Sequence, residues 1–120
     1  MFGLRIRKLA YCLIRPTLWT ALRLGVAPTI DHLHPLRSLR FKTVLDVGAN
    51  RGQFALLARA LWPDACIVCF EPLPEPLITL NKIAKAKDLT VIPVALSDVS
   101  GTVDIYVTKA DESSSIFPIS

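Results

Sequence analysis

A short turn between a β-rich segment and a helical segment carries the residues of this sequence that are best suited to chemistry. Asp46 lies at the tip of the β-rich segment, one residue before its end, and Gly48, Asn50 and Gly52 follow it. Glycines at such a turn let the backbone approach a ligand and let a helix approach a strand, because no Cβ stands in the way. Asn50 tolerates a left-handed backbone and offers its amide. Since ligands of doubly wound sheets lie at the carboxyl ends of the strands, we expect this turn to bind a nucleotide-like molecule.

The glycine spacing and the neighbouring acid limit the kind of ligand. Gly48 and Gly52 follow a G-x-x-x-G pattern, unlike the G-x-G-x-x-G of dinucleotide folds, in which a pyrophosphate lies at a helix N-terminus. This disfavours a nicotinamide-dependent enzyme. The carboxylate of Asp46 repels a phosphate and attracts an ammonium group, so S-adenosyl-L-methionine, a cationic nucleoside without phosphate, matches the charges. Asp46 taken alone is equally suited to capping the helix that follows.

Acidic residues also end the next two β-rich segments. Glu71 comes 25 residues after Asp46, at a place where an acid can accept hydrogen bonds from both hydroxyls of a ribose. Ser97 and Asp98 end the third segment, at the height of an adenine edge. Taken alone, Glu71 is typical of a solvated loop carboxylate, and Ser97-Asp98 is ordinary turn chemistry. The three strand ends together, each with an acid and in this chain order, favour a cofactor site.

Alternating strands and helices must position these residues. Runs rich in apolar and β-branched residues predict strands at 43–47, 65–70, 90–96 and 102–107. Apolar residues at helical spacing predict helices at 52–62 and 75–87. This order is typical of right-handed crossovers and of a mostly parallel sheet that is covered on both faces. We therefore expect an α/β fold with a Rossmann-like sheet.

The residues ahead of the sheet form a basic arm. Residues 1–42 hold eight lysines and arginines and the single acid Asp31, a balance of +7, whereas residues 43–120 balance to −3. An anionic partner should therefore meet the arm. The pI of about 9.2 reflects this local excess of base, so we expect no nucleic-acid partner.

The arm is predicted to be helical at 4–15, where four apolar residues share one stripe with basic residues across from it. The stripe consists of Ile6, Leu9, Ala10 and Leu13. Pro16 ends that helix, a second short apolar pattern reaches Gly25, and 26–41 is a connector with one helical turn. This stripe, within residues 1–25, suits either an anionic membrane surface or packing against the half of the domain that lies beyond residue 120. No uncharged apolar run reaches 18 residues and no signal cleavage site follows, which favours a cytoplasmic location, at the inner membrane surface if the arm binds lipid.

Cysteine and histidine spacing does not predict a metal site. Cys66 and Cys69 stand three apart in a strand-like run, so their side chains face opposite sides of a sheet and cannot chelate one ion. His32 and His34 flank Leu33 in the connector, where we expect a surface role for both. Buried free thiols in a reducing cytoplasm are the simplest interpretation of the three cysteines.

As a set, these motifs resemble the FkbM family of S-adenosyl-L-methionine-dependent methyltransferases. The motifs are Asp46-Val47-Gly48-Ala49-Asn50-x-Gly52-x-Phe54, Phe70-Glu71-Pro72 and Ala95-Leu96-Ser97-Asp98 with Gly101. The resemblance covers residues 25–117, including the polar serine loop at 113–115. It implies a class I methyltransferase sheet and a cofactor site that also includes Phe54. It further implies O-methylation of a hydroxyl on a small-molecule or glycan acceptor, such as a sugar, a glycolipid or a polyketide-like compound.

The sequence departs from that family at its end. It stops at Ser120, before the strand that carries acidic and lysine residues facing the transferring methyl group, so we assign no catalytic residue. We expect a helical arm and connector at 1–41 and the N-terminal half of a methyltransferase domain at 42–120, as a fragment or as a truncated and inactive product. A half sheet exposes an edge and an apolar face, which predicts aggregation or a homo-oligomer. The alternative is a non-catalytic α/β module that docks to a membrane or a partner protein through its arm.

Overall fold

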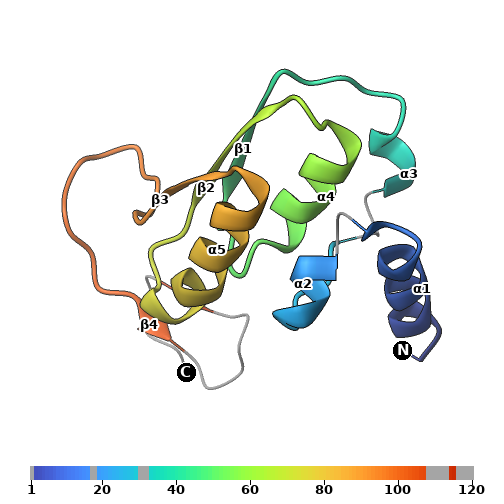
Figure 1. The fold of residues 1–120 in the computed structure, drawn as a ribbon. Coiled ribbons are helices and arrows are strands. Elements are labelled where there is room, and N and C mark those ends of the chain that lie inside the picture. Colours follow the sequence, from blue (N-terminus) through green and yellow to red (C-terminus); the bar gives the residue numbers. More distant parts are fainter. Residues whose placement is uncertain (1, 17–18, 30–32, 108–113, 116–120) are drawn as a thin grey trace.

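The computed structural model describes residues 2–16, 19–29, 33–107 and 114–115. Its helices and strands are α1 (Phe2–Leu13), α2 (Trp19–Arg23), α3 (Leu33–Leu36), β1 (Thr43–Val47), α4 (Gln53–Leu61), β2 (Cys66–Phe70), α5 (Pro74–Lys87), β3 (Thr90–Ile92), β4 (Tyr106–Val107) and β5 (Ser114–Ser115). The predicted alternation of strands and helices from β1 to β3 is confirmed (Figure 1). The helical arm is confirmed as well, and α3 is the helical turn expected in its connector.

A parallel sheet with the strand order β1-β2-β3 lies at the centre of the molecule. The pairing of β1 with β2 runs from Thr43 opposite Cys66 to Val47 opposite Phe70, and β3 pairs with the other edge of β2. Both crossovers step in the same direction, and α4 and α5 lie on the same face of the sheet (Figure 1). The register therefore places the carboxyl ends of β1 and β2 side by side.

The second face of this sheet is open to solvent. Leu45 and Val47 are 60% and 58% exposed, and their partners in the register, Val68 and Phe70, are only half-buried. The expectation of a sheet covered on both faces is wrong for the described residues, whereas the exposed apolar face expected of a half sheet is present. The physical reason is the common direction of the two crossovers, because a helix reaches the other face only where the strand order reverses.

Two clusters of buried side chains hold the helices in place. The first lies between the sheet and its two helices and includes Ile67 and Leu80. The second joins the arm to the outer side of the same helices through Cys12, Leu56 and Ile83. Because α4 packs against the sheet on one side and against the arm on the other, its sequence is apolar nearly all round.

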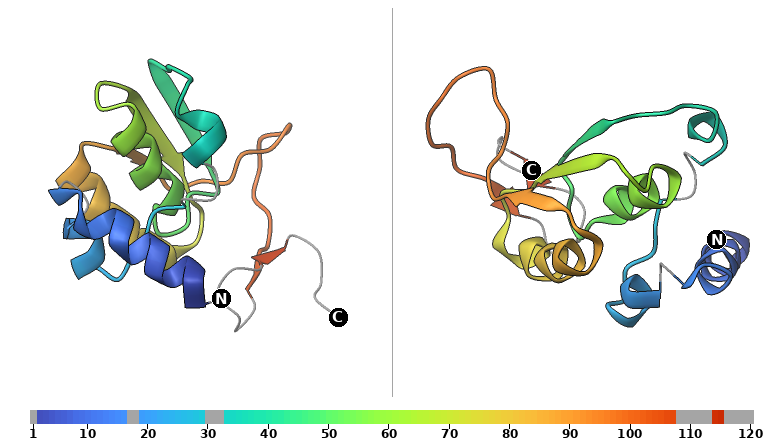
Figure 2. Two further views of the ribbon diagram at one scale, coloured as in Figure 1. Left: turned by 90° about the vertical axis from the view of Figure 1, so that its right-hand side faces the viewer. Right: turned by 45° about the horizontal axis from the view of Figure 1, so that its top comes forward.

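The last two predicted strands are much shorter than expected. β3 ends at Ile92 and does not reach Leu96, because Pro93 has no N–H to donate to a ladder. Only Tyr106–Val107 of the strand predicted at 102–107 is extended and paired. It pairs antiparallel with β5, outside the main sheet, so Ser114–Ser115 are not part of a loop as expected, and Ser113 lies outside the described residues. Figure 2 shows the long excursion of the chain between β3 and β4.

At the end of the sheet where the strands begin, Arg59 links the α4–β2 loop to the end of α5. Its Nη1 donates to Pro63 O and Ala65 O at 2.7 Å each, Nη2 to Asp88 O at 2.6 Å, and Nε to Lys87 O at 3.0 Å. These carbonyls belong to the α4–β2 loop and to the end of α5. One side chain thus fixes the start of β2 against the start of β3, at the end opposite the predicted site.

Candidate functional site at the carboxyl ends of β1 and β2

The turn after β1 is docked onto the end of β2. The N–H groups of Gly48 and Ala49 both donate to Phe70 O, at 2.9 and 3.0 Å. Gly48 has φ 77° and Asn50 has φ 50°, which is the left-handed backbone expected of these residue types. A Cβ added at Gly48 would meet no atom within 4 Å. The backbone conformation requires glycine there, and the space beside it is open.

The side chain of Glu71 links this turn to the loop that follows β2 by hydrogen bonds. Its carboxylate is buried, with the residue only 5% exposed. Oε2 accepts from the backbone N–H of Asn50 at 2.8 Å, and Oε1 accepts from the backbone N–H of Leu73 at 2.9 Å. The predicted convergence of the first two strand ends is therefore a direct contact in the structure. Glu71 is not a solvated loop carboxylate, and its first partners are backbone groups.

Asp46 lies beside this pair at the tip of β1, with only 8% of its surface exposed. Burial raises the pKa of the Asp46 carboxyl, a backbone hydrogen bond from Ala55 lowers it, and the nearby charge of Glu71 raises it again, with a net upward direction. Two carboxylates thus share one poorly solvated corner. A cation placed there would favour the charged form of Asp46.

Two acceptor atoms of this corner have no hydrogen-bond partner. Asp46 Oδ2 and Asn50 Oδ1 are both buried, and neither is paired. Buried polar atoms are nearly always satisfied in native proteins, and leaving one unsatisfied costs about 1–3 kcal/mol. A ligand that brings N–H donors and positive charge would satisfy both atoms. An ammonium group next to the open space at Gly48 fits this donor requirement.

Gly52 and Phe54, also predicted to bind the cofactor, contribute to packing. Gly52 has φ 92°, and a Cβ added there would meet Leu80 Cδ1 at 3.1 Å. The glycine therefore allows the start of α4 to approach α5. Phe54 is half-buried and packs against the cluster between the sheet and its helices. Both residues hold the turn in position from the core side.

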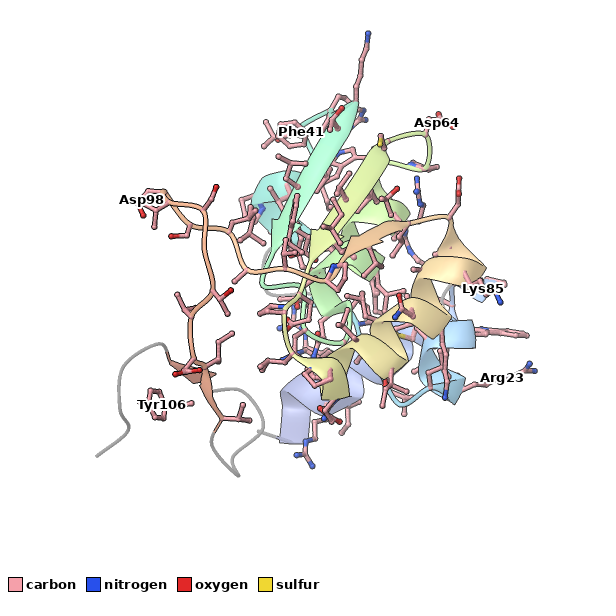
Figure 3. All side chains as sticks on the ribbon, turned by 90° about the vertical axis from the view of Figure 1, so that its left-hand side faces the viewer. Arg23, Phe41, Asp64, Lys85, Asp98 and Tyr106 are labelled. Atoms are coloured by element: carbon pink, nitrogen blue, oxygen red, sulfur yellow. The ribbon has the colours of Figure 1, made fainter. Side chains whose placement is uncertain are left out.

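Ser97 and Asp98 are not brought to this corner. Both are exposed, and the Ser97 hydroxyl donates to Asp98 Oδ1 at 3.1 Å. Figure 3 shows Asp98 on the excursion after β3, projecting away from the sheet. The early end of β3 at Ile92 explains this placement, because the chain has already left the sheet before it reaches Ser97.

The sequence analysis missed the backbone donors that hold the two carboxylates. One of them had a readable signal. Leu73 stands between Pro72 and Pro74, which have no N–H, so it is the one backbone donor close behind Glu71. The donor at Ala55 lies in the first turn of α4 and agrees with the capping role that the sequence also allows for Asp46. The donation from Asn50 N–H to Glu71 had no such signal.

The cysteines lie as their spacing predicts. Cys69 is buried opposite Asp46 in the register, whereas Cys66 is exposed, so the expectation of buried thiols fails for Cys66. Burial, and secondarily the charge of Asp46, raises the pKa of the Cys69 thiol to about 12, which makes it a neutral and unreactive group. Within the part of the chain that the structure describes, no three metal-ligating side chains gather.

Two open cavities of about 460 Å³ lie at the other end of the sheet. Arg59, Pro63 and Asp88 line both of them, and Asp64 marks this end in Figure 3. Neither cavity is lined by Asp46, Asn50 or Glu71. Cavity volume alone does not identify the ligand site, since the unpaired buried acceptors lie at the strand tips and not in these cavities.

Comparisons with known proteins do not add a family to this picture. Neither a scan against protein-family models nor a search of curated proteins finds a match for this chain. Among residues 2–16, 19–29, 33–107 and 114–115, no helix is both long and apolar enough to cross a bilayer. The chemistry of the strand tips therefore carries the functional assignment.

Proposed function

We propose that this chain binds S-adenosyl-L-methionine at the carboxyl ends of β1 and β2, as part of an O-methyltransferase of the FkbM type. The observation that carries the proposal is the unpaired, buried acceptor pair Asp46 Oδ2 and Asn50 Oδ1 beside a second buried carboxylate. A site of this kind selects a ligand that carries a cation and N–H donors, and it disfavours phosphates. The motif resemblance and the parallel sheet support the same assignment.

Each side chain of the corner has a role in this proposal. Asp46 and Asn50 accept hydrogen bonds from the ammonium of the methionine moiety. Glu71 already accepts two backbone N–H groups, and each carboxylate oxygen keeps lone-pair capacity for a ribose hydroxyl. Gly48 supplies the open space beside the turn. Ser97 and Asp98 stay candidates for the adenine edge only if the excursion after β3 folds back.

The protein's own contribution to methyl transfer is positioning. When bound, S-adenosyl-L-methionine supplies an electrophilic methyl group on a sulfonium, and the acceptor class implied by the resemblance is a hydroxyl on a sugar, a glycolipid or a polyketide-like compound. The hydrogen bonds from Asn50 and Leu73 to Glu71 hold the binding corner in one geometry before the ligand arrives, which reduces the entropic cost of orientation. No described residue is assigned as a general base.

The test is calorimetric titration with S-adenosylhomocysteine of the wild type, Asp46→Asn and Asn50→Gly. Both substitutions remove one unpaired acceptor, and glycine suits the left-handed backbone of Asn50. We expect each variant to lose about tenfold or more in affinity, since a charge-assisted hydrogen bond contributes about 1.5–3 kcal/mol. Glu71→Ala is a poorer probe, because it also removes two structural hydrogen bonds.

Asp64→Asn is the matched control, since Asp64 is an exposed carboxylate at the other end of the sheet (Figure 3). It should bind like the wild type. A folded wild-type chain that gives no heat with the nucleoside would refute the proposal. Equal affinity of Asp46→Asn and Asp64→Asn would place any binding elsewhere on the protein.

A further inference from the structure

The outer side of α1 exposes an apolar stripe. Ile6, Leu9 and Leu13 are 59%, 51% and 56% exposed, and their spacing of three and four residues puts them on one side of the helix. We call these three residues the outer stripe. Figure 1 shows α1 at the margin of the molecule, and the left view of Figure 2, which looks onto that side, shows α1 in front of the other elements. In the structure the outer stripe is exposed and belongs to neither core cluster.

The other side of α1 is the one that packs against the body. Cys12 is fully buried there, and Tyr11 is half-buried against the second core cluster. Arg15 lies over the Tyr11 ring at 4.7 Å from its centroid. A helix on the surface of a globular protein normally turns its most apolar side inward. Here the aliphatic stripe faces outward, while Cys12 and Tyr11 pack against the body.

The apolar surface continues around the carboxyl end of α1. Ile14 is 77% exposed and Trp19 is 49% exposed. The Trp19 indole Nε1 donates to Leu13 O at 3.3 Å, which holds the ring beside the end of the outer stripe. An indole with a half-exposed apolar body and a satisfied N–H is a side chain typical of membrane–water interfaces.

The charges around the outer stripe have one sign. Residues 1–30 contain five lysines and arginines and no acid. Arg5 and Arg7 are exposed, and helical geometry places them on the two flanks of the stripe. Arg23 is exposed on the neighbouring helix α2. An apolar stripe with cationic flanks complements a surface that is apolar beneath an anionic layer.

We propose that α1 docks onto the surface of an anionic lipid bilayer, lying in the plane of the interface. The outer stripe, Ile14 and Trp19 enter the boundary between headgroups and acyl chains, and Arg5 and Arg7 contact the lipid phosphates. The buried side of α1 keeps the α/β body attached on the aqueous side. This inference does not depend on the proposed cofactor site, since none of its residues lies at the strand tips.

The test is co-sedimentation of the whole chain with vesicles of phosphatidylcholine alone or with about a third of phosphatidylserine. Ile6→Ser/Leu9→Ser/Leu13→Ser removes the stripe, and Arg5→Gln/Arg7→Gln removes the flanking charge. Each change should lower the apparent affinity for the anionic vesicles by about tenfold or more, without unfolding the protein, because all five side chains are exposed. Ile78→Ser and Lys82→Gln on α5 are matched exposed controls and should bind like the wild type.

Trp19 gives a second readout, because brominated lipid should quench its fluorescence. Trp62 is only 5% exposed and donates to Leu39 O, so a Trp19→Phe variant should bind but lose the quenching. The proposal is overturned if the folded wild type does not bind anionic vesicles, or if loss of the outer stripe leaves binding unchanged. It is also overturned if sedimentation shows the stripe to be buried between two copies that do not bind lipid.

Discussion

At the scale of residues, the sequence indicated the side chains of the candidate site but only some of their hydrogen-bond partners. Asp46 and Glu71 were chosen because acids follow two strands, and the structure joins their surroundings through the bond from Asn50 N–H to Glu71 Oε2. The sequence does not indicate that the Asn50 N–H donates to Glu71. That contact depends on where the turn and the next loop lie in space.

The buried Asp46 carboxylate should lower the stability of the folded protein at neutral pH. We expect Asp46→Asn to raise the free energy of unfolding at neutral pH by on the order of 1 kcal/mol, because it removes a buried charge without a cationic partner. The folded-state pKa of Asp46 is raised, so folding favours the neutral carboxyl. The penalty is therefore full above the folded-state pKa and disappears below the unfolded-state pKa of about 3.9.

The measurement is urea unfolding of wild type and Asp46→Asn at about pH 7 and about pH 4. The advantage of the variant should shrink as the pH falls, and other titrating groups cancel in the difference. Asp64→Asn, at an exposed carboxylate, should show little difference at either pH. A variant that is less stable than wild type at neutral pH would mean that the Asp46 charge already has a stabilising partner.

At the scale of elements, strong periodicity predicted α4, α5, β1 and β2 to within a few residues. The failures came where local composition and tertiary pairing disagree. The run at 90–96 is β-rich in composition, yet Pro93 stops the strand at Ile92. The run at 102–107 alternates like a strand, but only its last two residues find a partner. Alternating polar and apolar residues indicate that a segment can form a strand. They do not show whether another strand lies beside it to pair with.

Arg59 should be the strongest single link between elements outside the core. Replacing it with alanine leaves four backbone carbonyls without their donor, and we expect the free energy of unfolding to fall by about 2–4 kcal/mol. Arg59→Lys should recover only part of this loss, because an ammonium lacks the planar fork of donors. Chemical denaturation measures both.

Lys82→Ala, at an exposed position of α5, is the control for the loss of a long basic side chain. It should change stability by no more than about 0.5 kcal/mol. If Arg59→Ala is as mild as this control, the four hydrogen bonds do not stabilise the junction of α4, β2 and α5.

At the scale of the whole molecule, the sheet has one covered face and one open face. The element order predicted the parallel sheet, but the coverage of its faces depends on the direction in which successive strands are added. Since β1, β2 and β3 are added in one direction, the open face presents Leu45 and Val47 to solvent. Likewise, helical spacing shows which residues of α1 share one side of the helix. It does not show whether that side faces the protein or the solvent.

The open sheet face should make the chain self-associate. We expect the sedimentation coefficient of the wild type to rise with concentration, because exposed strand edges and apolar patches pair with one another. Leu45→Thr/Val47→Thr should weaken this association by about tenfold or more while keeping β propensity. Ile78→Thr, at a similarly exposed residue on α5, should leave it unchanged. A wild type that stays monomeric at all concentrations would contradict the expectation.

The central claim is that the carboxyl ends of β1 and β2 form the ligand site, and an amide-resolved NMR titration with S-adenosylhomocysteine tests it most directly. We predict that the backbone amides of Gly48, Ala49 and Asn50 shift with the ligand, while those of Ala65 and Asp88 beside the Arg59 cavities do not. Shifts confined to the Arg59 end of the sheet, or no shifts at saturating ligand, would contradict the account.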